Sequence, residues 1–166
     1  PMYRRQRQMC IRDRSNIDYK KVQDPYSFRC APQVHGAVYE ALLGMQSTIY
    51  IELNSTTDNP LVFADAPKLS DRIVSQGNFH GEILALCADR MSLALFELGS
   101  ISERRMDQLL DPSKSGLTPF LAADSGLESG LMIVQYSAGA ALAELHGHAA
   151  PRSAFSTSTS AGQEDH

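Results

Sequence analysis

The stretch ILALCADRMSLALFEL, residues 83–98, is apolar over more than one side of an α-helix. A helix with one apolar stripe lies at a surface, whereas a helix that is apolar on every side is surrounded by other helices. Asn78 is a suitable N-cap before this stretch, and Asp111-Pro112 is a stop signal after it. The sequence therefore predicts a long central helix that begins at Asn78 and ends at about Leu110.

Two further helices are predicted, one before and one after this central helix. Over residues 25–53 apolar residues recur at steps of three and four, the spacing of an amphipathic helix; they are Val34, Val38, Leu42, Met45, Ile49 and Leu53. A similar pattern covers residues 124–146, with many small residues that permit close helix approach. Residues 61–77 and 151–162 have no sustained period and are predicted to be irregular.

The predicted fold class is all-α, a bundle of long helices, because no alternating strand pattern or internal repeat is present in the sequence. Three such helices leave much apolar surface for so short a chain. We expect either further segments of the same polypeptide or other subunits to cover that surface.

Composition and charge narrow the function. The 166 residues are 43% hydrophobic, enough for the core of one soluble globular domain. Residues 1–15 carry five Arg and one Asp, whereas the rest of the chain carries ten basic and eighteen acidic residues. The excess of acidic residues outside residues 1–15 argues against nucleic-acid binding, which needs clustered Lys and Arg. We interpret residues 1–15 as an unrelated or disordered tail or a sequence artefact, and residues 16–166 as the helical domain.

The cysteines and the hydropathy predict a compartment. Cys10, Cys30 and Cys87 are odd in number and widely spaced. This spacing favours a reducing compartment over a disulfide framework, so we expect a cytoplasmic protein. No run reaches the roughly 18 apolar residues of a membrane helix, and no membrane association is expected.

The first candidate site is the stretch Val22-Gln23-Asp24-Pro25-Tyr26-Ser27-Phe28-Arg29. Asp24 is a suitable N-cap and Pro25 a suitable first helical residue, which places Tyr26 and Arg29 on one face of the first turn. A phenol can hydrogen-bond or exchange a proton, and a guanidinium can bind a carboxylate with two hydrogen bonds. The alternative is an ordinary helix start with an exposed Arg.

Two further candidates are weaker. In Gly77-Asn78-Phe79-His80-Gly81-Glu82, the His80 and Glu82 side chains are spaced to orient one another at a helix start. A capping Asn78 and a packing Phe79 are the structural alternative. Glu164 carries a carboxylate suited to acid–base chemistry, although a solvated carboxylate is the simpler interpretation.

Other motifs argue against particular functions. His146 and His148 have no third ligand nearby, so no metal site is predicted. Ser102-Glu103-Arg104-Arg105 is expected to be a structural charge cluster that pairs with acidic residues on neighbouring chains. The sequence contains neither a Gly-rich phosphate loop nor a nucleophile elbow, which argues against nucleotide-binding and serine-hydrolase functions.

Several blocks of the sequence, taken together, resemble the aromatic amino acid ammonia-lyases in that family's order. The blocks are residues 22–29, Glu52-Leu53-Asn54-Ser55-Thr56-Thr57-Asp58-Asn59-Pro60, residues 77–82, residues 102–105 and Gln163-Glu164-Asp165-His166. The pattern is most similar to the histidine-specific enzymes, because of His80 with Glu82 and of the Gln163-Glu164 pair. Residues 146–156 depart from those enzymes, which leaves tyrosine or phenylalanine lyases and aminomutases open.

The resemblance implies a helical fold of the fumarase and aspartase type, assembled as a homotetramer with active sites between subunits. It implies elimination of ammonia from an aromatic amino acid; for the histidine-specific enzymes, L-histidine gives trans-urocanate. The electrophile of the family is 4-methylidene-imidazol-5-one (MIO), formed from an internal Ala-Ser-Gly. This sequence has no Ala-Ser-Gly, so we expect a fragment that is inactive alone. A non-catalytic helical assembly module is the alternative.

The resemblance also implies roles for individual residues. Arg29 is expected to bind the substrate carboxylate, and Tyr26 to hydrogen-bond near the reacting amine or to assist proton transfer. Gln23 and Phe79 are expected to line the pocket beside the electrophile. Asn78 supports the local hydrogen-bond network in this scheme, His80 contributes to substrate binding, and Glu164 faces the imidazole or takes part in acid–base steps.

Overall fold

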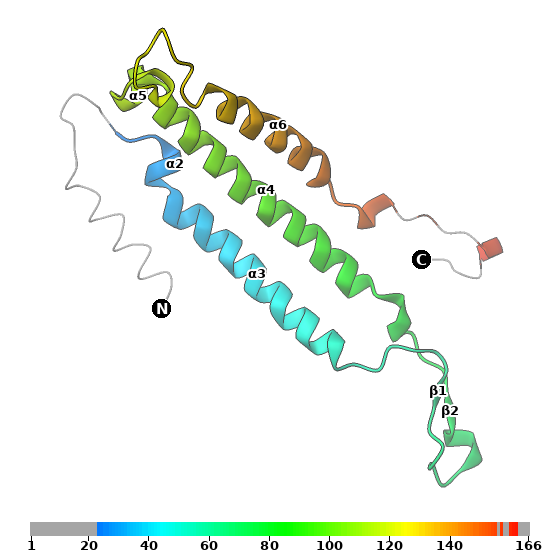
Figure 1. Ribbon diagram of the computed structural model, residues 1–166. Helices are drawn as coiled ribbons and strands as arrows, with labels where there is room; N and C mark the ends of the chain where they lie inside the picture. Colours follow the sequence, from blue (N-terminus) through cyan, green and yellow to red (C-terminus); the bar gives the residue numbers. More distant parts are fainter. Residues whose placement is uncertain (1–22, 156, 158–159, 163–166) are drawn as a thin grey trace. The chain divides into compact units, whose positions relative to one another are not determined.

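Three long helices dominate the computed structural model, which describes residues 23–155, 157 and 160–162 (Figure 1). They are α3 (Ala31–Leu53), α4 (Glu82–Leu110) and α6 (Met132–His148), of 23, 29 and 17 residues. The shorter elements are α2 (Tyr26–Arg29), β1 (Leu61–Val62), η2 (Leu69–Asp71), β2 (Ile73–Val74), η3 (Asn78–His80), α5 (Pro112–Ser115), η4 (Pro119–Leu121), η5 (Ser153–Phe155) and η6 (Ser160–Gly162). The long helices predicted from the apolar periods are confirmed.

The first predicted helix is divided at Cys30 into α2 and α3. Pro32 has no backbone N–H to donate to the Phe28 carbonyl, so the regular hydrogen-bond ladder cannot continue through this point. The chain instead bonds the N–H groups of Gln33 and Val34 to the Cys30 carbonyl, each at 3.1 Å. The break separates a four-residue helix from the long one that follows.

Both predicted N-caps are wrong. Pro25 has an extended ψ of 149° and occupies the capping position of α2 itself, and no side chain caps this turn. Asn78 lies in η3, which is separated from α4 by Gly81 with a φ of +75°. Because this left-handed conformation interrupts a helix, α4 begins only after Gly81, whose carbonyl accepts the N–H of Leu84 at 2.9 Å.

The third helix begins later than predicted, at Met132 rather than near Asp124. Gly126 has a φ of +107°, which keeps the preceding chain out of the helical conformation. Gly130 has a φ of +50°, and a Cβ atom there would lie 2.4 Å from the Phe120 carbonyl oxygen. Residues 124–131 are therefore a loop that packs closely on the η4 turn.

Residues 61–77, predicted to be irregular, contain a small antiparallel hairpin. Leu61 lies opposite Val74, and Val62 lies opposite Ile73. β-Branched residues favour this pairing, but strands of two residues are too short to show an alternating period in the sequence.

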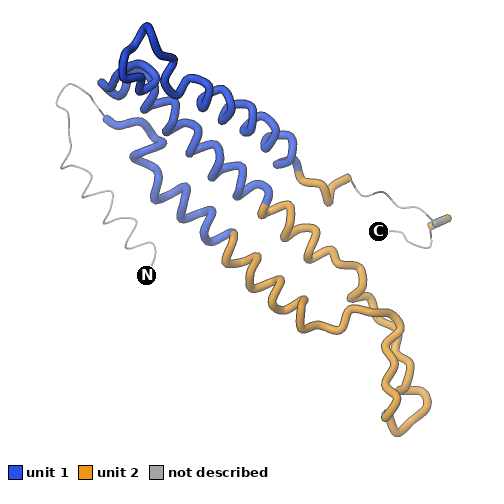
Figure 2. Tube along the Cα trace, viewed as in Figure 1, with its two compact units in different colours: residues 1–41, 92–150 blue, residues 42–91, 151–166 orange. Residues whose placement is uncertain are grey.

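The chain divides into two compact units, which we describe one at a time (Figure 2). Among the described residues, unit 1 comprises 23–41 and 92–150, and unit 2 comprises 42–91, 151–155, 157 and 160–162. Within unit 1, α6 packs on α4: a Cβ atom at Gly99 would lie 3.1 Å from Leu145, and the rings of Phe96 and His146 are 5.2 Å apart. The buried apolar side chains of the described residues all belong to unit 1; they are Val38, Ala94, Ile101, Leu110, Ala122 and Ala149.

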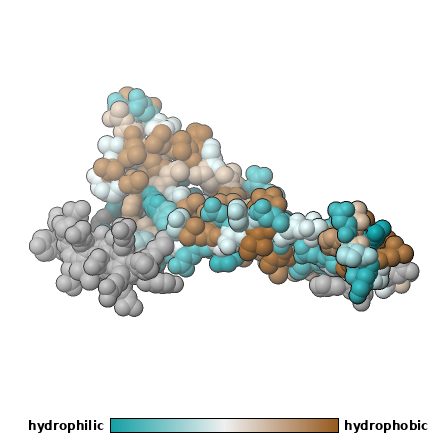
Figure 3. Space-filling view, turned by 90° about the horizontal axis from the view of Figure 1, so that it is seen from below, coloured by the Kyte–Doolittle hydropathy of each residue, from teal (hydrophilic) through white to brown (hydrophobic). Residues whose placement is uncertain are grey.

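Many large apolar side chains remain exposed in each unit, as the predicted excess of apolar surface requires. Tyr136 of unit 1 is 65% exposed and Leu53 of unit 2 is 79% exposed. Figure 3 shows hydrophobic side chains on the face seen from below. No helix among the described residues is both long and apolar enough to cross a membrane. Cys30 and Cys87 are free thiols.

Candidate functional site

The predicted residues Gln23, Tyr26 and Arg29 lie together at the start of α2. The Cζ atom of Arg29 is 4.9 Å from the centroid of the Tyr26 ring, so the guanidinium lies over one face of the phenol. Arg29 Nη1 donates a hydrogen bond to Gln23 Oε1. We call Gln23, Tyr26 and Arg29 the clamp, because an amide and an aromatic ring both contact one guanidinium.

The clamp leaves the charge of Arg29 without an acidic partner among the described residues. Its two contacts, a carboxamide and a phenol ring, are neutral. A guanidinium has five N–H donors, so donors remain for an anion after the bond to Gln23 is made. Tyr26 is 66% exposed, which leaves its side chain accessible to a ligand. The clamp is therefore suited to binding a carboxylate beside a phenol.

The turn that carries the clamp is anchored by Arg105 of α4. Ser27 lies between Tyr26 and Phe28 and is buried, at 8% exposure. Its carbonyl accepts a hydrogen bond from Arg105 Nε at 2.8 Å. Arg105 Nη2 also lies 2.5 Å from His35 Nε2. The sequence predicts that the charged block containing Arg105 pairs with acidic residues on neighbouring chains; within the chain itself, Arg105 contacts a backbone carbonyl and a His.

Asn78 belongs to unit 2 and takes part in a local hydrogen-bond network. Its side-chain Nδ2 donates to the Thr56 carbonyl at 3.3 Å, and its N–H donates to Gln76 Oε1. Asn59 Oδ1 in turn accepts the Gln76 N–H at 3.0 Å and the Ser75 hydroxyl at 3.1 Å. These bonds connect the segment before η3 to the loop that follows α3.

Phe79 and His80 follow Asn78 in the same short turn. Phe79 is 59% exposed, so its ring is not part of a packed core. His80 Nδ1 lies 3.9 Å from Glu82 Oε2, with both side chains partly exposed. The structure thus brings His80 and Glu82 together, as the spacing predicts, at the distance limit of an ion pair.

Glu164, the remaining candidate, lies outside the described residues. Within unit 2, the segment after α6 is attached to α4 by Asp89. The Asp89 carboxylate accepts the N–H groups of Arg152 at 2.7 Å and Ser153 at 3.0 Å, and the Ser153 hydroxyl at 2.5 Å. The bond from the Ser153 hydroxyl, followed by the backbone bonds, lowers the pKa of Asp89.

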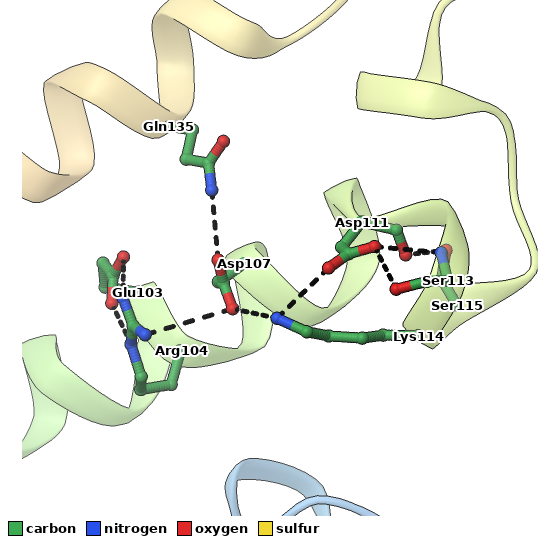
Figure 4. A network of polar contacts seen from close by, with 8 residues as sticks. All are labelled: Glu103, Arg104, Asp107, Asp111, Ser113, Lys114, Ser115 and Gln135. Atoms are coloured by element: carbon green, nitrogen blue, oxygen red, sulfur yellow. Dashed lines mark hydrogen bonds and ion pairs between the residues drawn. The ribbon is translucent and has the colours of Figure 1, made fainter.

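An ion-pair network occupies the C-terminal part of α4 in unit 1 (Figure 4). Glu103 is buried, at 7% exposure, and accepts a hydrogen bond from Arg104 Nη2 at 2.6 Å. This pairing raises the pKa of Arg104. Asp107 accepts hydrogen bonds from Lys114 Nζ at 2.9 Å and from Gln135 Nε2 of α6 at 3.2 Å.

The network continues to Asp111, which caps α5. Asp111 Oδ1 accepts the Ser113 hydroxyl at 2.6 Å and the Ser113 N–H at 2.9 Å, and these bonds lower the pKa of Asp111. Asp107 and then Asp111 raise the pKa of Lys114. We call Glu103, Arg104, Asp107, Asp111 and Lys114 the ion-pair network. Since each shift favours the charged form, the network is a structural element of unit 1.

His146 and His148 have structural contacts. The His146 ring packs on Phe96, and His148 Nε2 lies 4.0 Å from Glu144 Oε1. Among the residues that the structure describes, no group of three or more His, Cys, Asp or Glu side chains is placed to hold a metal ion.

Known proteins resemble nearly the whole chain. A family model described as aromatic amino acid lyase matches residues 5–166. The chain is 51% identical over 152 residues to a histidine ammonia-lyase of Myxococcus xanthus (strain DK1622). The matched region covers 92% of this chain and 29% of that protein.

Solved structures share the fold. The crystal structure of histidine ammonia-lyase from Trypanosoma cruzi matches with a TM-score of 0.80 and 49% identity, over 87% of this chain and 28% of that chain. The Pantoea agglomerans phenylalanine aminomutase matches with a TM-score of 0.78 and 35% identity, over the same 87% and 28%. The all-α expectation is thereby confirmed, and the chain spans less than a third of the length of these relatives.

Proposed function

Because the chain belongs to the aromatic amino acid lyase family, we propose that the full-length protein containing it eliminates ammonia from L-histidine to give trans-urocanate. The observation that carries this proposal concerns the Arg29 guanidinium. It contacts an amide and a phenol ring, and no carboxylate among the described residues contacts it. An amino acid substrate supplies the missing carboxylate. The similarity to relatives named histidine ammonia-lyase supports histidine as that amino acid.

Arg29 binds the substrate carboxylate in this proposal. A planar guanidinium forms two parallel hydrogen bonds to a carboxylate, which fixes the orientation as well as the position of the substrate. The bond to Gln23 and the contact with the Tyr26 ring restrict the Arg29 side chain before the substrate arrives. Such pre-organisation reduces the entropy that substrate binding must remove.

Tyr26 acts at the reacting end of the amino acid. Loss of ammonia requires removal of a weakly acidic hydrogen from the carbon next to the ring while the amine departs. The Tyr26 hydroxyl is proposed to hydrogen-bond to the amine or to assist proton transfer. Tyr26 and Arg29 lie side by side on one turn, so the residue that binds the carboxylate is next to the residue that acts on the neighbouring amine.

The remaining candidates are proposed to contact the side chain of the substrate or to support those contacts. Glu164 faces the imidazole, since a carboxylate can accept a hydrogen bond from that ring or pair with its charged form. Gln23 of unit 1 and Phe79 of unit 2 are each proposed to line a pocket of the full-length assembly. Asn78 maintains the hydrogen bonds that support its own turn, and His80 contributes to substrate recognition. The exposed Phe79 ring and the Asn78 hydrogen bonds support these roles.

The family's MIO group forms from an Ala-Ser-Gly triplet, which this sequence does not contain. The side chains proposed to lie next to it, the Gln23 amide and the exposed Phe79 ring, are neutral and weakly nucleophilic, as a neighbour of an electrophile must be. When present, the MIO group supplies an electrophile that makes the amine a better leaving group. The residues of this chain then bind the carboxylate, orient the amine and hold protons.

We further propose that the full-length protein is a cytoplasmic homotetramer whose active sites lie between subunits. The exposed apolar side chains of each unit support assembly, and the free thiols of Cys30 and Cys87 support a reducing compartment. Light scattering of the purified full-length protein measures its mass directly. A monomeric mass at micromolar concentration would contradict the assembly.

The experiment that tests the substrate is a urocanate assay on the full-length protein. Urocanate absorbs in the ultraviolet, so its formation from L-histidine is followed continuously, with L-phenylalanine and L-tyrosine as matched substrates. Turnover of L-histidine alone is the expected result. Elimination or isomerisation of phenylalanine or tyrosine instead would assign the protein to another branch, and the 35% identity to a phenylalanine aminomutase makes that the second candidate.

A further inference from the structure

The short helix α2 ends with a carbonyl that the helix itself does not use. The Cys30 N–H bonds to the Tyr26 carbonyl at 2.8 Å, but among the described backbone hydrogen bonds none joins the Ala31 N–H to the Ser27 carbonyl. The ladder stops there because α2 is interrupted before α3 begins. A buried carbonyl without a partner costs free energy, so Ser27 needs a donor from elsewhere.

Arg105 is that donor. Its Nε lies 2.8 Å from the Ser27 oxygen, and a bond from a cation to a carbonyl at a helix C-terminus is stronger than one between neutral groups. Figure 1 shows α2 beside the part of α4 that belongs to unit 1. Arg105 Nη2 also contacts His35 Nε2 at 2.5 Å. Since Arg can only donate, His35 accepts there, and two bonds fix the guanidinium.

We infer that Arg105 is a positioning residue for substrate binding: by holding the Ser27 carbonyl it fixes the turn from which Tyr26 and Arg29 project. Ser27 is one residue from Tyr26 and two from Arg29, so a shift of this carbonyl moves these two clamp residues together. The inference rests on the proposed role of the clamp in carboxylate binding. It adds a residue that acts through the clamp and does not touch the substrate.

The test uses the full-length protein with Arg105→Met, which removes the donors and keeps the apolar stem. Loss of a charge-assisted hydrogen bond that orients Arg29 is expected to raise KM for L-histidine about tenfold, with a smaller change in kcat. Arg105→Lys keeps the positive charge and a single donor nitrogen but not the planar fork, and an increase in KM of about threefold is expected. Arg104→Met is the matched control on the same helix, and its KM is expected to equal that of the wild type.

A second measurement separates positioning from general loss of stability. If Arg105 acts through the clamp, the double variant Arg29→Ala with Arg105→Met loses less kcat/KM than the product of the two single losses, since the two effects share one turn and are not additive. A loss equal to the product of the two single effects would overturn the inference. So would a wild-type KM in both Arg105 variants, and Arg105→Lys decides the question where Arg105→Met does not fold.

Amide hydrogen exchange tests the positioning role of Arg105 separately from the proposed substrate. Faster exchange of the Phe28, Arg29 and Cys30 amides is expected in Arg105→Met and not in Arg104→Met, whichever amino acid the enzyme uses. Equal exchange in the two variants would overturn the positioning role even if L-histidine is the substrate. If L-histidine is not turned over, the proposed substrate fails, and the exchange and the KM for the amino acid that is turned over still decide the role of Arg105.

Discussion

The clamp and the ion-pair network both belong to unit 1, but they differ in whether their charged side chains contact a side chain of opposite charge. In the network each charged side chain contacts one of opposite sign: Arg104 contacts Glu103, and Lys114 contacts Asp107 and Asp111. In the clamp the cation of Arg29 contacts an amide and an aromatic ring. Charges that neutralise one another stabilise a fold, whereas a cation with neutral partners is ready to bind an anion.

The pKa shifts within the ion-pair network agree with its structural role. The hydrogen bonds that Arg104 donates to Glu103 raise the pKa of Arg104, and those that Ser113 donates to Asp111 lower the pKa of Asp111, so these groups are held in their charged forms. Such groups are poor proton donors or acceptors near neutral pH. Inspection of partners therefore distinguishes the two polar clusters of this unit better than their composition does.

Arg29→Ala is expected to give the largest effect. If the clamp binds the substrate carboxylate, kcat/KM of the full-length enzyme falls by about a thousandfold, since the truncation leaves the substrate carboxylate without its cationic partner. Arg29→Lys keeps the charge without the fork and is expected to lose less. Steady-state kinetics measure both variants. Unchanged kinetics in Arg29→Ala would show that the clamp does not bind the substrate, and the functional distinction between the clamp and the ion-pair network would then be wrong.

Tyr26→Phe is expected to give the next effect and to sharpen the role of the phenol. The substitution keeps the ring beside Arg29 and removes only the hydroxyl. If that hydroxyl assists proton transfer, kcat falls by about a hundredfold while KM changes little. A rise in KM with unchanged kcat would instead assign Tyr26 to substrate binding alone.

Arg104→Met probes the network and should leave the clamp intact. Glu103 is buried, so loss of its partner is expected to lower the free energy of unfolding by about 1 kcal/mol, a value reduced because Arg104 itself is largely exposed to solvent. Chemical denaturation of the full-length protein measures this change. A large loss of kcat/KM without a loss of stability would show that the network, too, serves catalysis.

The smallest expected effect is the acid sensitivity of the network. Because the pKa of Asp111 is lowered in the folded chain, mainly by Ser113, its contribution to stability is present above the ordinary Asp pKa of about 3.9 and is lost as the pH falls toward the folded value. Below about pH 4 the melting temperature of the wild type should fall more steeply than that of Asp111→Asn. Parallel profiles would contradict this contribution.

The sequence was sufficient to predict the long helices, because their apolar residues repeat over many turns. It failed where a few residues decide the geometry. Pro32 interrupts the first helix, and the positive φ of Gly126 and Gly130 delays the third. The hairpin in residues 61–77 depends on pairing between distant residues, which leaves no period to detect.

The site was predictable in its local part. Tyr26 and Arg29 are three residues apart, and helical spacing alone brings them to one face. Arg105 was visible as part of a charged block, yet its partner is a backbone carbonyl that has no signature in the sequence. The structure shows only which of these side chains lie together. The functional roles of all the candidates stay predictions; they are Gln23, Tyr26, Arg29, Asn78, Phe79, His80 and Glu164.

The anchor of α2 also has a consequence for the order of folding. The contact between Arg105 and Ser27 joins residues 78 positions apart, whereas Lys114 and Asp111 are separated by a single helical turn. The entropy lost on closing a segment grows with its length, so the local pair forms before the distant one. In pulse-labelling exchange we expect the α5 amides to gain protection ahead of the α2 amides, which would make the substrate-binding turn a late product of folding.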